Sequence, residues 1–172
     1  MTPGGGQDAG GRGQALVEFA LIVVIMLILV MGLVDYARVF HTRQVITALS
    51  REGSNLASRG TAMTNVCATL VVSARPLDIN ASGYIILSQV VRTSSGTLVL
   101  TNQVTRGGLI SGSKIGTRGA TGSAVHLPVA GLPTTNQSLM VTEVYYRFTP
   151  STPIGKLLGL ASPTGLYDVS YF

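Results

Sequence analysis

The organisation of this chain depends on residues 11–40, which read GRGQALVEFALIVVIMLILVMGLVDYARVF. Within them, residues 14–34 form a run of 21 residues with a single charged side chain, Glu18. As a helix this run spans about 31 Å, close to the hydrocarbon thickness of a bilayer. The run is apolar on all sides, which is typical of a helix in lipid or fully buried in protein. A carboxylate there is costly unless it is paired, so Glu18 is a candidate functional residue.

The helical pattern continues beyond the apolar run. No proline lies between Gln14 and Arg75, and Gly60 is a suitable end, which predicts one helix over residues 14–58, about 67 Å long. From residue 36 the pattern becomes amphipathic, with one face for a globular domain. That face is predicted to hold Tyr36, Val39, Phe40, Ile46, Leu49, Gly53 and Leu56, interrupted by Arg43, whereas Arg38, Thr42, Ser50, Arg51 and Ser58 are expected on the opposite side.

Residues 1–13, MTPGGGQDAGGRG, are polar and glycine-rich, and no helix is expected in them. A secretory signal peptide has a shorter apolar region followed by a small-residue cleavage site, and neither feature is present here. An uncleaved signal anchor is one interpretation of this N-terminus.

The remainder of the chain predicts a small domain with more strands than helices. The expected elements are a helix at 64–74 (with a strand as the alternative), a hairpin of strands 84–93 and 97–105, a glycine-rich loop at 106–123, a strand at 138–149, a short apolar piece at 154–160 and a terminal strand at 167–172. A long helix followed by antiparallel strands predicts an α+β fold.

Composition excludes some classes of protein. The formal net charge is +5 and hydrophobic residues make up 46% of the chain, but the basic residues are dispersed, so no nucleic-acid partner is expected. Cys67 is the single cysteine, which excludes an intrachain disulfide, and it is expected to pack as a small hydrophobic residue.

Motifs that resemble catalytic or ligand sites are incomplete. Residues 107–114, GGLISGSK, approach a phosphate-binding loop, but Ser113 separates the glycine from the lysine that should follow it directly. His41 and His126 lack metal-ligand spacing, and no nucleophile elbow is present. We therefore expect no enzyme activity, no metal and no cofactor.

Four segments carry a resemblance to a known family. The stretch Gly13-Gln14-Ala15-Leu16-Val17-Glu18-Phe19, followed by the apolar run, resembles the class III signal sequence of type IV pilin-like proteins. Together with DYARVF, SREGSNLASRG at 50–60 and VTEVYYRFTPSTPI at 141–154, it looks like a TadE-type minor pseudopilin of the tight-adherence pilus. The resemblance implies a leader at 1–13, a long helix at 14–60 and a globular pilin-like domain at 61–172.

The resemblance also implies functions for particular residues. A prepilin peptidase would cut between Gly13 and Gln14, and Glu18 and Phe19 would act in filament assembly. The implied partners are that peptidase, other pilin and pseudopilin subunits, the Tad assembly machinery of the bacterial inner membrane, and membrane lipid before assembly. The globular domain would be extracytoplasmic and, after assembly, part of a cell-surface adhesive pilus. Two alternatives stay open: the principal subunit of a filament, and a permanently anchored binding domain.

Overall fold

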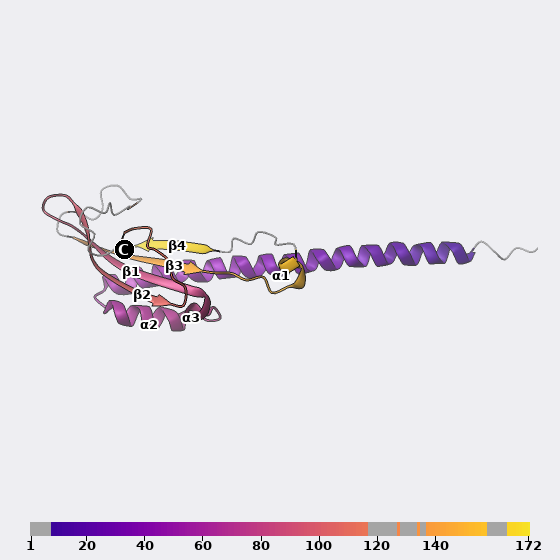
Figure 1. Cartoon of the computed structure of the whole chain (residues 1–172), viewed down its shortest axis with the longest axis horizontal. Helices are drawn as coiled ribbons and strands as arrows, with labels where there is room; N and C mark the ends of the chain where they lie inside the picture. The colour runs from indigo at the N-terminus through magenta and orange to yellow at the C-terminus, as the bar shows by residue number, and fades with distance from the viewer. Residues whose placement is uncertain (1–7, 117–126, 128–133, 135–136, 158–164) are drawn as a thin grey trace, which may run out of the picture. The chain divides into compact units, whose positions relative to one another are not determined.

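The computed structural model describes residues 8–116, 127, 134, 137–157 and 165–172, and it shows an α+β fold (Figure 1). The helices are α1 (Asp8–Ser58), α2 (Met63–Ser73), α3 (Ile79–Ser82) and α4 (Pro153–Leu157). The strands are β1 (Gly83–Arg92), β2 (Leu98–Gly107), β3 (Ser138–Tyr146) and β4 (Leu166–Tyr171). They form one sheet in the order β2-β1-β3-β4, and every neighbouring pair is antiparallel. The predicted fold class is confirmed.

The chain divides into two compact units, which we describe separately. The helical unit comprises residues 1–39 and 150–162, and thus contains the N-terminal part of α1 together with α4. The sheet unit comprises residues 40–149 and 163–172, and contains the C-terminal part of α1, α2, α3 and all four strands.

The predicted hairpin is confirmed as β1 and β2. Their register runs from Tyr84 opposite Gly107 to Arg92 opposite Leu98, with a shift between Gln89 and Val90. The connection turns at Gly96, whose φ of +83° is the left-handed conformation that glycine adopts without steric cost. The second predicted helix is confirmed as α2, and Cys67 on it is buried, as expected.

The C-terminal part of α1 packs closely on the sheet at Gly53. A Cβ built there would lie 2.8 Å from Leu70 of α2 and 2.8 Å from Thr142 of β3. Ile46 and Leu49, on the preceding turns, are buried. These three positions of the predicted packing face are confirmed.

Other positions of that face were predicted wrongly. Tyr36 and Phe40 are exposed, whereas Thr42 and Ser50, expected on the solvent side, are buried. For Ser50 the reason is a pair of polar contacts from this part of α1 to β4: Ser50 Oγ donates to Asp168, and Ser54 Oγ, one turn later, donates to Ser170 over 3.1 Å. Because small hydroxyl side chains find partners on the sheet, the helix buries them there.

Several element ends also differ from the prediction. α1 begins at Asp8, so the expectation of no helix before Gln14 is wrong for residues 8–13. Extending a formed helix adds one hydrogen bond per residue, which offsets the low helix propensity of glycine. β3 ends at Tyr146 rather than at 149, and β2 takes in residues 106 and 107 of the expected loop. Residues 117–123 of that loop and 158–160 of the apolar piece lie outside the described residues.

The face of the sheet opposite α1 carries a second apolar cluster. Val90, Leu139 and Val141 of the strands pack there with Ile115 of the 108–116 segment, and all four are buried. Gly107, with φ +140°, begins this segment, and a Cβ there would lie 2.3 Å from the carbonyl oxygen of Gly83. Glycine therefore allows the chain to leave β2 directly against β1.

Candidate functional site

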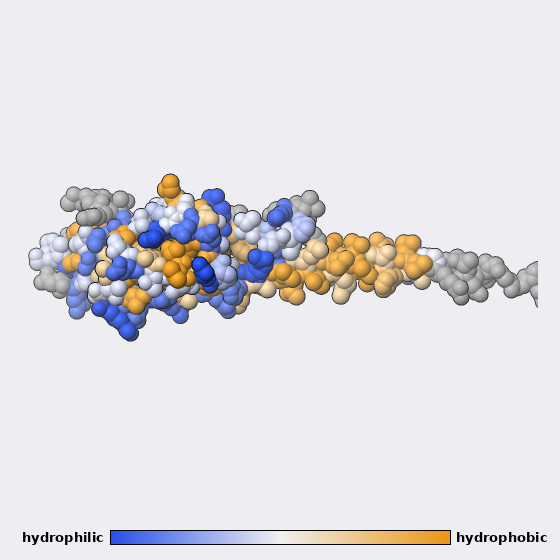
Figure 2. Space-filling model, turned by 90° about the horizontal axis from the view of Figure 1, so that it is seen from below, coloured by the Kyte–Doolittle hydropathy of each residue, from blue (hydrophilic) through white to orange (hydrophobic). Residues whose placement is uncertain are grey.

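The N-terminal part of α1 presents an apolar surface without protein cover. Every residue from Gly13 to Val30 is exposed, and hydrophobic side chains follow this part of the helix in Figure 2. The helix is long and apolar enough to cross a membrane. An uncovered apolar surface of this length requires lipid or other apolar helices around it.

The structure brings two of the predicted site residues together at the start of this surface. The side-chain amide of Gln14 donates to the Glu18 carboxylate over 3.0 Å, one turn along the helix. Gly13 has open space where a Cβ would point. Phe19 is 65% exposed and is adjacent to Glu18 in sequence, so it lies on a different face of the helix. Glu18 and Phe19 therefore project in different directions.

A second acid, Asp35, lies directly after the apolar run and is only 7% exposed. The backbone N–H groups of Ser151 and Thr152 lie 3.2 and 3.3 Å from its Oδ1, and the Thr152 hydroxyl donates to its Oδ2. Thr152 Oγ1 in turn accepts from the N–H of Gly155 over 3.1 Å. A Cβ at Gly155 would lie 2.1 Å from Asp35 Oδ2, so a larger residue does not fit. We call Asp35, Ser151, Thr152 and Gly155 the clasp.

The third acid, Glu143 of β3, is fully buried in the sheet unit. It accepts from the Ser113 hydroxyl and, over 2.9 Å, from the N–H of Lys114. The hydroxyls of Tyr145 and Tyr167 lie 3.2 and 3.0 Å from its Oε1. Four donors surround the carboxylate, which fastens the 108–116 segment to the sheet.

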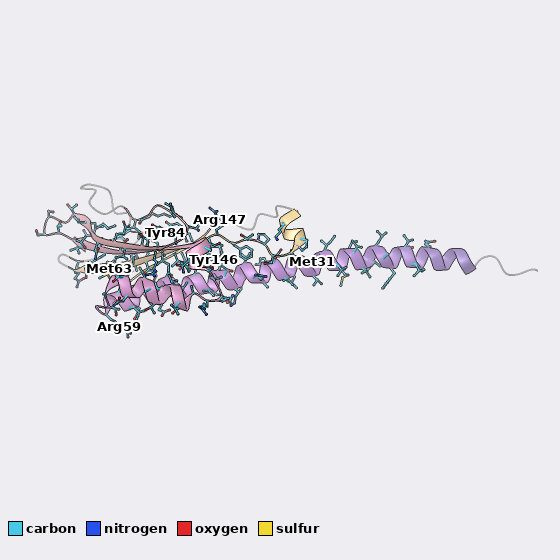
Figure 3. All side chains as sticks on the ribbon, turned by 60° about the horizontal axis from the view of Figure 1, so that its bottom comes forward. Met31, Arg59, Met63, Tyr84, Tyr146 and Arg147 are labelled. Carbon is cyan, nitrogen blue, oxygen red and sulfur yellow. The ribbon has the colours of Figure 1, made fainter. Side chains whose placement is uncertain are left out.

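The surroundings of the two tyrosines beside Glu143 change the pKa of their hydroxyl groups. Burial raises the pKa of Tyr145 and Tyr167, and the negative charge of Glu143 raises both further. The rings of the two tyrosines lie 4.8 Å apart, and the Lys114 ammonium lies 3.7 Å from the centre of the Tyr167 ring. Residues 113 and 114 of the incomplete phosphate-loop motif thus contact Glu143 and Tyr167. An open pocket of about 370 Å³ lies beside these rings, lined in part by Ile110, Lys114 and Arg147 (Arg147 is labelled in Figure 3).

The comparison with protein families matches the helix rather than the sheet. The model of the TadE-like protein family matches residues 13–55. This segment is TadE-like. It begins at the predicted cleavage glycine and ends near the C-terminus of α1, and it contains Gln14, Glu18, Phe19 and Asp35. The match indicates a pilin-like protein associated with the Tad pilus, and the exposed apolar helix fits a single-pass membrane anchor. No curated protein and no solved structure matches the chain.

Sequence reasoning missed the clasp and the Glu143 cluster. Asp35 stood in the quoted stretch but showed no partner in sequence, because Ser151 and Thr152 lie more than a hundred residues away. For Glu143 a signal existed: an acid between Val141 and Tyr145 occupies the same face of a strand as two apolar positions, which requires burial or pairing. Among the described residues there is no group of metal-binding side chains, and His126 lies outside them.

Proposed function

We propose that this chain is a minor pseudopilin of a Tad-type type IV pilus. A prepilin peptidase cleaves it after Gly13, and the TadE-like helix then assembles with other pilin and pseudopilin subunits. The observation that carries this proposal is the uncovered apolar surface of α1, which starts directly after Gly13 and holds Glu18 in its first turns. Before assembly this surface lies in the bacterial inner membrane, with the sheet unit outside the cytoplasm.

Cleavage would hydrolyse the Gly13–Gln14 peptide bond and create a positively charged amine on Gln14. In the uncut chain α1 already runs from Asp8, so the peptidase must unwind the first turns to reach the bond. Gly10, Gly11 and Gly13 make unwinding easy, because each glycine disfavours a helix by about 1 kcal/mol relative to alanine.

Glu18 then recruits the amine of a neighbouring subunit. In the uncut chain its carboxylate has the neutral amide of Gln14 as a partner at an exposed site. Inside a bundle of apolar helices a carboxylate and an amine are each costly alone, and pairing removes part of that cost. Subunits that place the two charges side by side are favoured, while Phe19 and the rest of the run pack against neighbouring helices.

The role of a minor subunit, which initiates, caps or modulates an adhesive pilus, is supported by the sheet unit. It adds a four-stranded sheet and two further helices to the assembly helix, and its pocket beside Tyr167 offers a surface for contacts beyond the filament core. The same pocket, with the cations Lys114 and Arg147 in its lining, favours one alternative: a permanently anchored binding domain that keeps its leader.

N-terminal sequencing of the full chain, purified from membranes with and without a prepilin peptidase, tests the proposal. The expected mature N-terminus is Gln14. Gly13→Val should block processing, because a branched side chain obstructs the peptidase at the scissile bond, whereas Gly32→Val should not. Both glycines have open space around them, so the two variants form a matched pair.

An intact Met1 in cells that hold the active peptidase would contradict the proposal and support the permanently anchored alternative. Counting the subunit in sheared filaments then separates a minor role from that of the principal subunit. We expect far fewer copies of this chain than of the main pilin.

A further inference from the structure

The burial pattern along the helical unit singles out one side of α1. Residues 13–30 are all exposed, Met31 is partly buried, and Asp35 one turn later is buried, while residues 32–34 and 36–38 between and after them are exposed. The clasp contacts show what covers this side: residues 151–155 lie against Asp35. In Figure 3 the side chain of Met31 lies beside α4.

The position of the clasp relative to the apolar run gives it a role. Asp35 is the first residue after the run, and its carboxylate accepts from two backbone N–H groups, of Ser151 and Thr152, and from the Thr152 hydroxyl. When the run spans the hydrocarbon layer, this segment must therefore lie at the membrane surface, where water and headgroups satisfy its remaining polar groups.

The residues around the clasp are of the types found at a membrane surface. Tyr36, directly after Asp35, is 70% exposed, and tyrosine is enriched where hydrocarbon meets water. Ser151, Pro153 and Lys156 are exposed on the clasped segment. A lysine at this level reaches headgroup phosphates with its ammonium while its stem covers apolar surface.

We infer that the clasped segment, residues 150–156, is a collar that binds the phospholipid headgroup region and sets how deeply α1 enters the bilayer. The partner is an anionic phospholipid surface, which Lys156 contacts. The inference rests on the membrane anchoring in the proposed function, but not on cleavage. If the chain is processed normally but residues 150–156 do not bind headgroups, the pseudopilin proposal stands and this inference fails. If residues 150–156 bind headgroups but the chain is not processed, this inference stands and the pseudopilin proposal fails.

Fluorescence quenching on the full chain tests the collar. The chain is reconstituted in vesicles of phosphatidylethanolamine and phosphatidylglycerol, with an environment-sensitive dye on Ser151→Cys. This position suits a label because its side chain is exposed and only its backbone N–H contacts Asp35. Cys67 is 1% exposed, and burial raises the pKa of its thiol to about 11, so it stays unlabelled at neutral pH while the sheet unit is folded.

The expected result is stronger quenching by nitroxides on the headgroup than by nitroxides in mid-chain. Asp35→Ala and Thr152→Val should remove this preference. Asp78→Ala is the matched control, because Asp78 also accepts a backbone N–H, over 3.1 Å from Ala81, but in the sheet unit.

Lys156→Gln tests the lipid contact. It should weaken headgroup quenching in the phosphatidylglycerol vesicles and have no effect in pure phosphatidylcholine. A wild-type label that no lipid nitroxide quenches would overturn the inference, and so would clasp variants that keep the wild-type profile. If Asp35→Ala exposes Cys67 to labelling, the fold has been lost, and Thr152→Val, which removes only a hydroxyl, decides the question.

Discussion

Three acids show how differently one kind of side chain is used within this chain. Glu18 lies on an exposed apolar surface with a single amide partner, whereas Asp35 and Glu143 are buried and surrounded by donors. Buried carboxylates with several hydrogen bonds are stable features of a fold. An acid that has one neutral partner and lies beside an apolar surface can exchange that partner for a charged one, which is why we propose an assembly role for Glu18.

The assembly role of Glu18 is tested by Glu18→Ala. Membrane insertion and cleavage should persist, because the apolar run and Gly13 are unchanged. Incorporation into sheared filaments should fall by about tenfold or more, since an unpaired amine inside a helix bundle costs several kcal/mol. Quantitative immunoblotting of sheared and membrane fractions measures this ratio.

Glu52→Ala is the control for that variant, because Glu52 is an exposed acid on the same helix but outside the apolar run. It should assemble normally. Normal piliation by Glu18→Ala as well would remove the argument for charge pairing.

At the scale of elements, α1 is one helix whose two parts have different surroundings. Its N-terminal part has apolar side chains on all sides and no cover, and its C-terminal part buries a stripe of small residues against the sheet. Ser50 and Ser54 contact Asp168 and Ser170 of β4, and Gly53 between them contacts β3. Small residues allow the helix axis to approach the strands closely. This close packing restricts the distance between helix and sheet more than a stripe of large apolar residues would.

Gly53→Val should destabilise the sheet unit by about 1 to 3 kcal/mol, because overpacking a close helix–sheet contact forces its neighbours apart. The new side chain would meet Leu70 and Thr142, whose atoms already lie 2.8 Å from the Cβ position. Denaturant unfolding of the full chain in detergent, followed by labelling of Cys67, measures the change.

Thr142→Val is the matched change on the opposite side of the same contact. The Thr142 hydroxyl is buried without a hydrogen-bond partner among the described residues, so replacing it with a methyl group should leave stability unchanged or raise it. A loss of stability in Thr142→Val comparable to that in Gly53→Val would contradict the argument that this hydroxyl lacks a hydrogen-bond partner.

At the scale of the whole molecule, the sheet unit is covered on both faces. α1 and α2 pack on one face, and the 108–116 segment, held by Glu143, covers part of the other. This arrangement buries the Cys67 thiol and partly buries Tyr145 and Tyr167, and all three groups are neutral at physiological pH. Burial raises the pKa of each of them.

These groups predict alkaline sensitivity of the fold. The Cys67 thiol has an ordinary pKa of 9.0 and a folded-state pKa of about 11, so between these values the unfolded chain binds fewer protons than the folded chain. Stability is therefore fully present below about pH 9 and falls as pH rises through 11, by about 2 to 3 kcal/mol for this thiol. The tyrosines act in the same direction at still higher pH.

Unfolding free energies measured from pH 7 to 11 should show this decline, and Cys67→Ala should flatten it between pH 9 and 11. A stability that stays constant over that range in the wild type would contradict the burial argument. Cys67→Ala also lowers stability at neutral pH by removing buried sulfur, so the slope with pH, not the absolute value, is the readout.

The sequence alone determined what depends on local pattern. The apolar run, the long helix, the hairpin and the α+β class follow from periodicity, composition and a family resemblance, all of which can be recognised within short stretches of sequence. The processing site at Gly13 and the assembly role of Glu18 stay predictions. Tertiary structure decided which side of α1 is buried, because Ser50 and Ser54 are polar until Asp168 and Ser170 are brought beside them. Tertiary structure likewise decided that Asp35 and Glu143 are buried, because a buried carboxylate is stable only with hydrogen-bond donors, and here distant parts of the chain supply them.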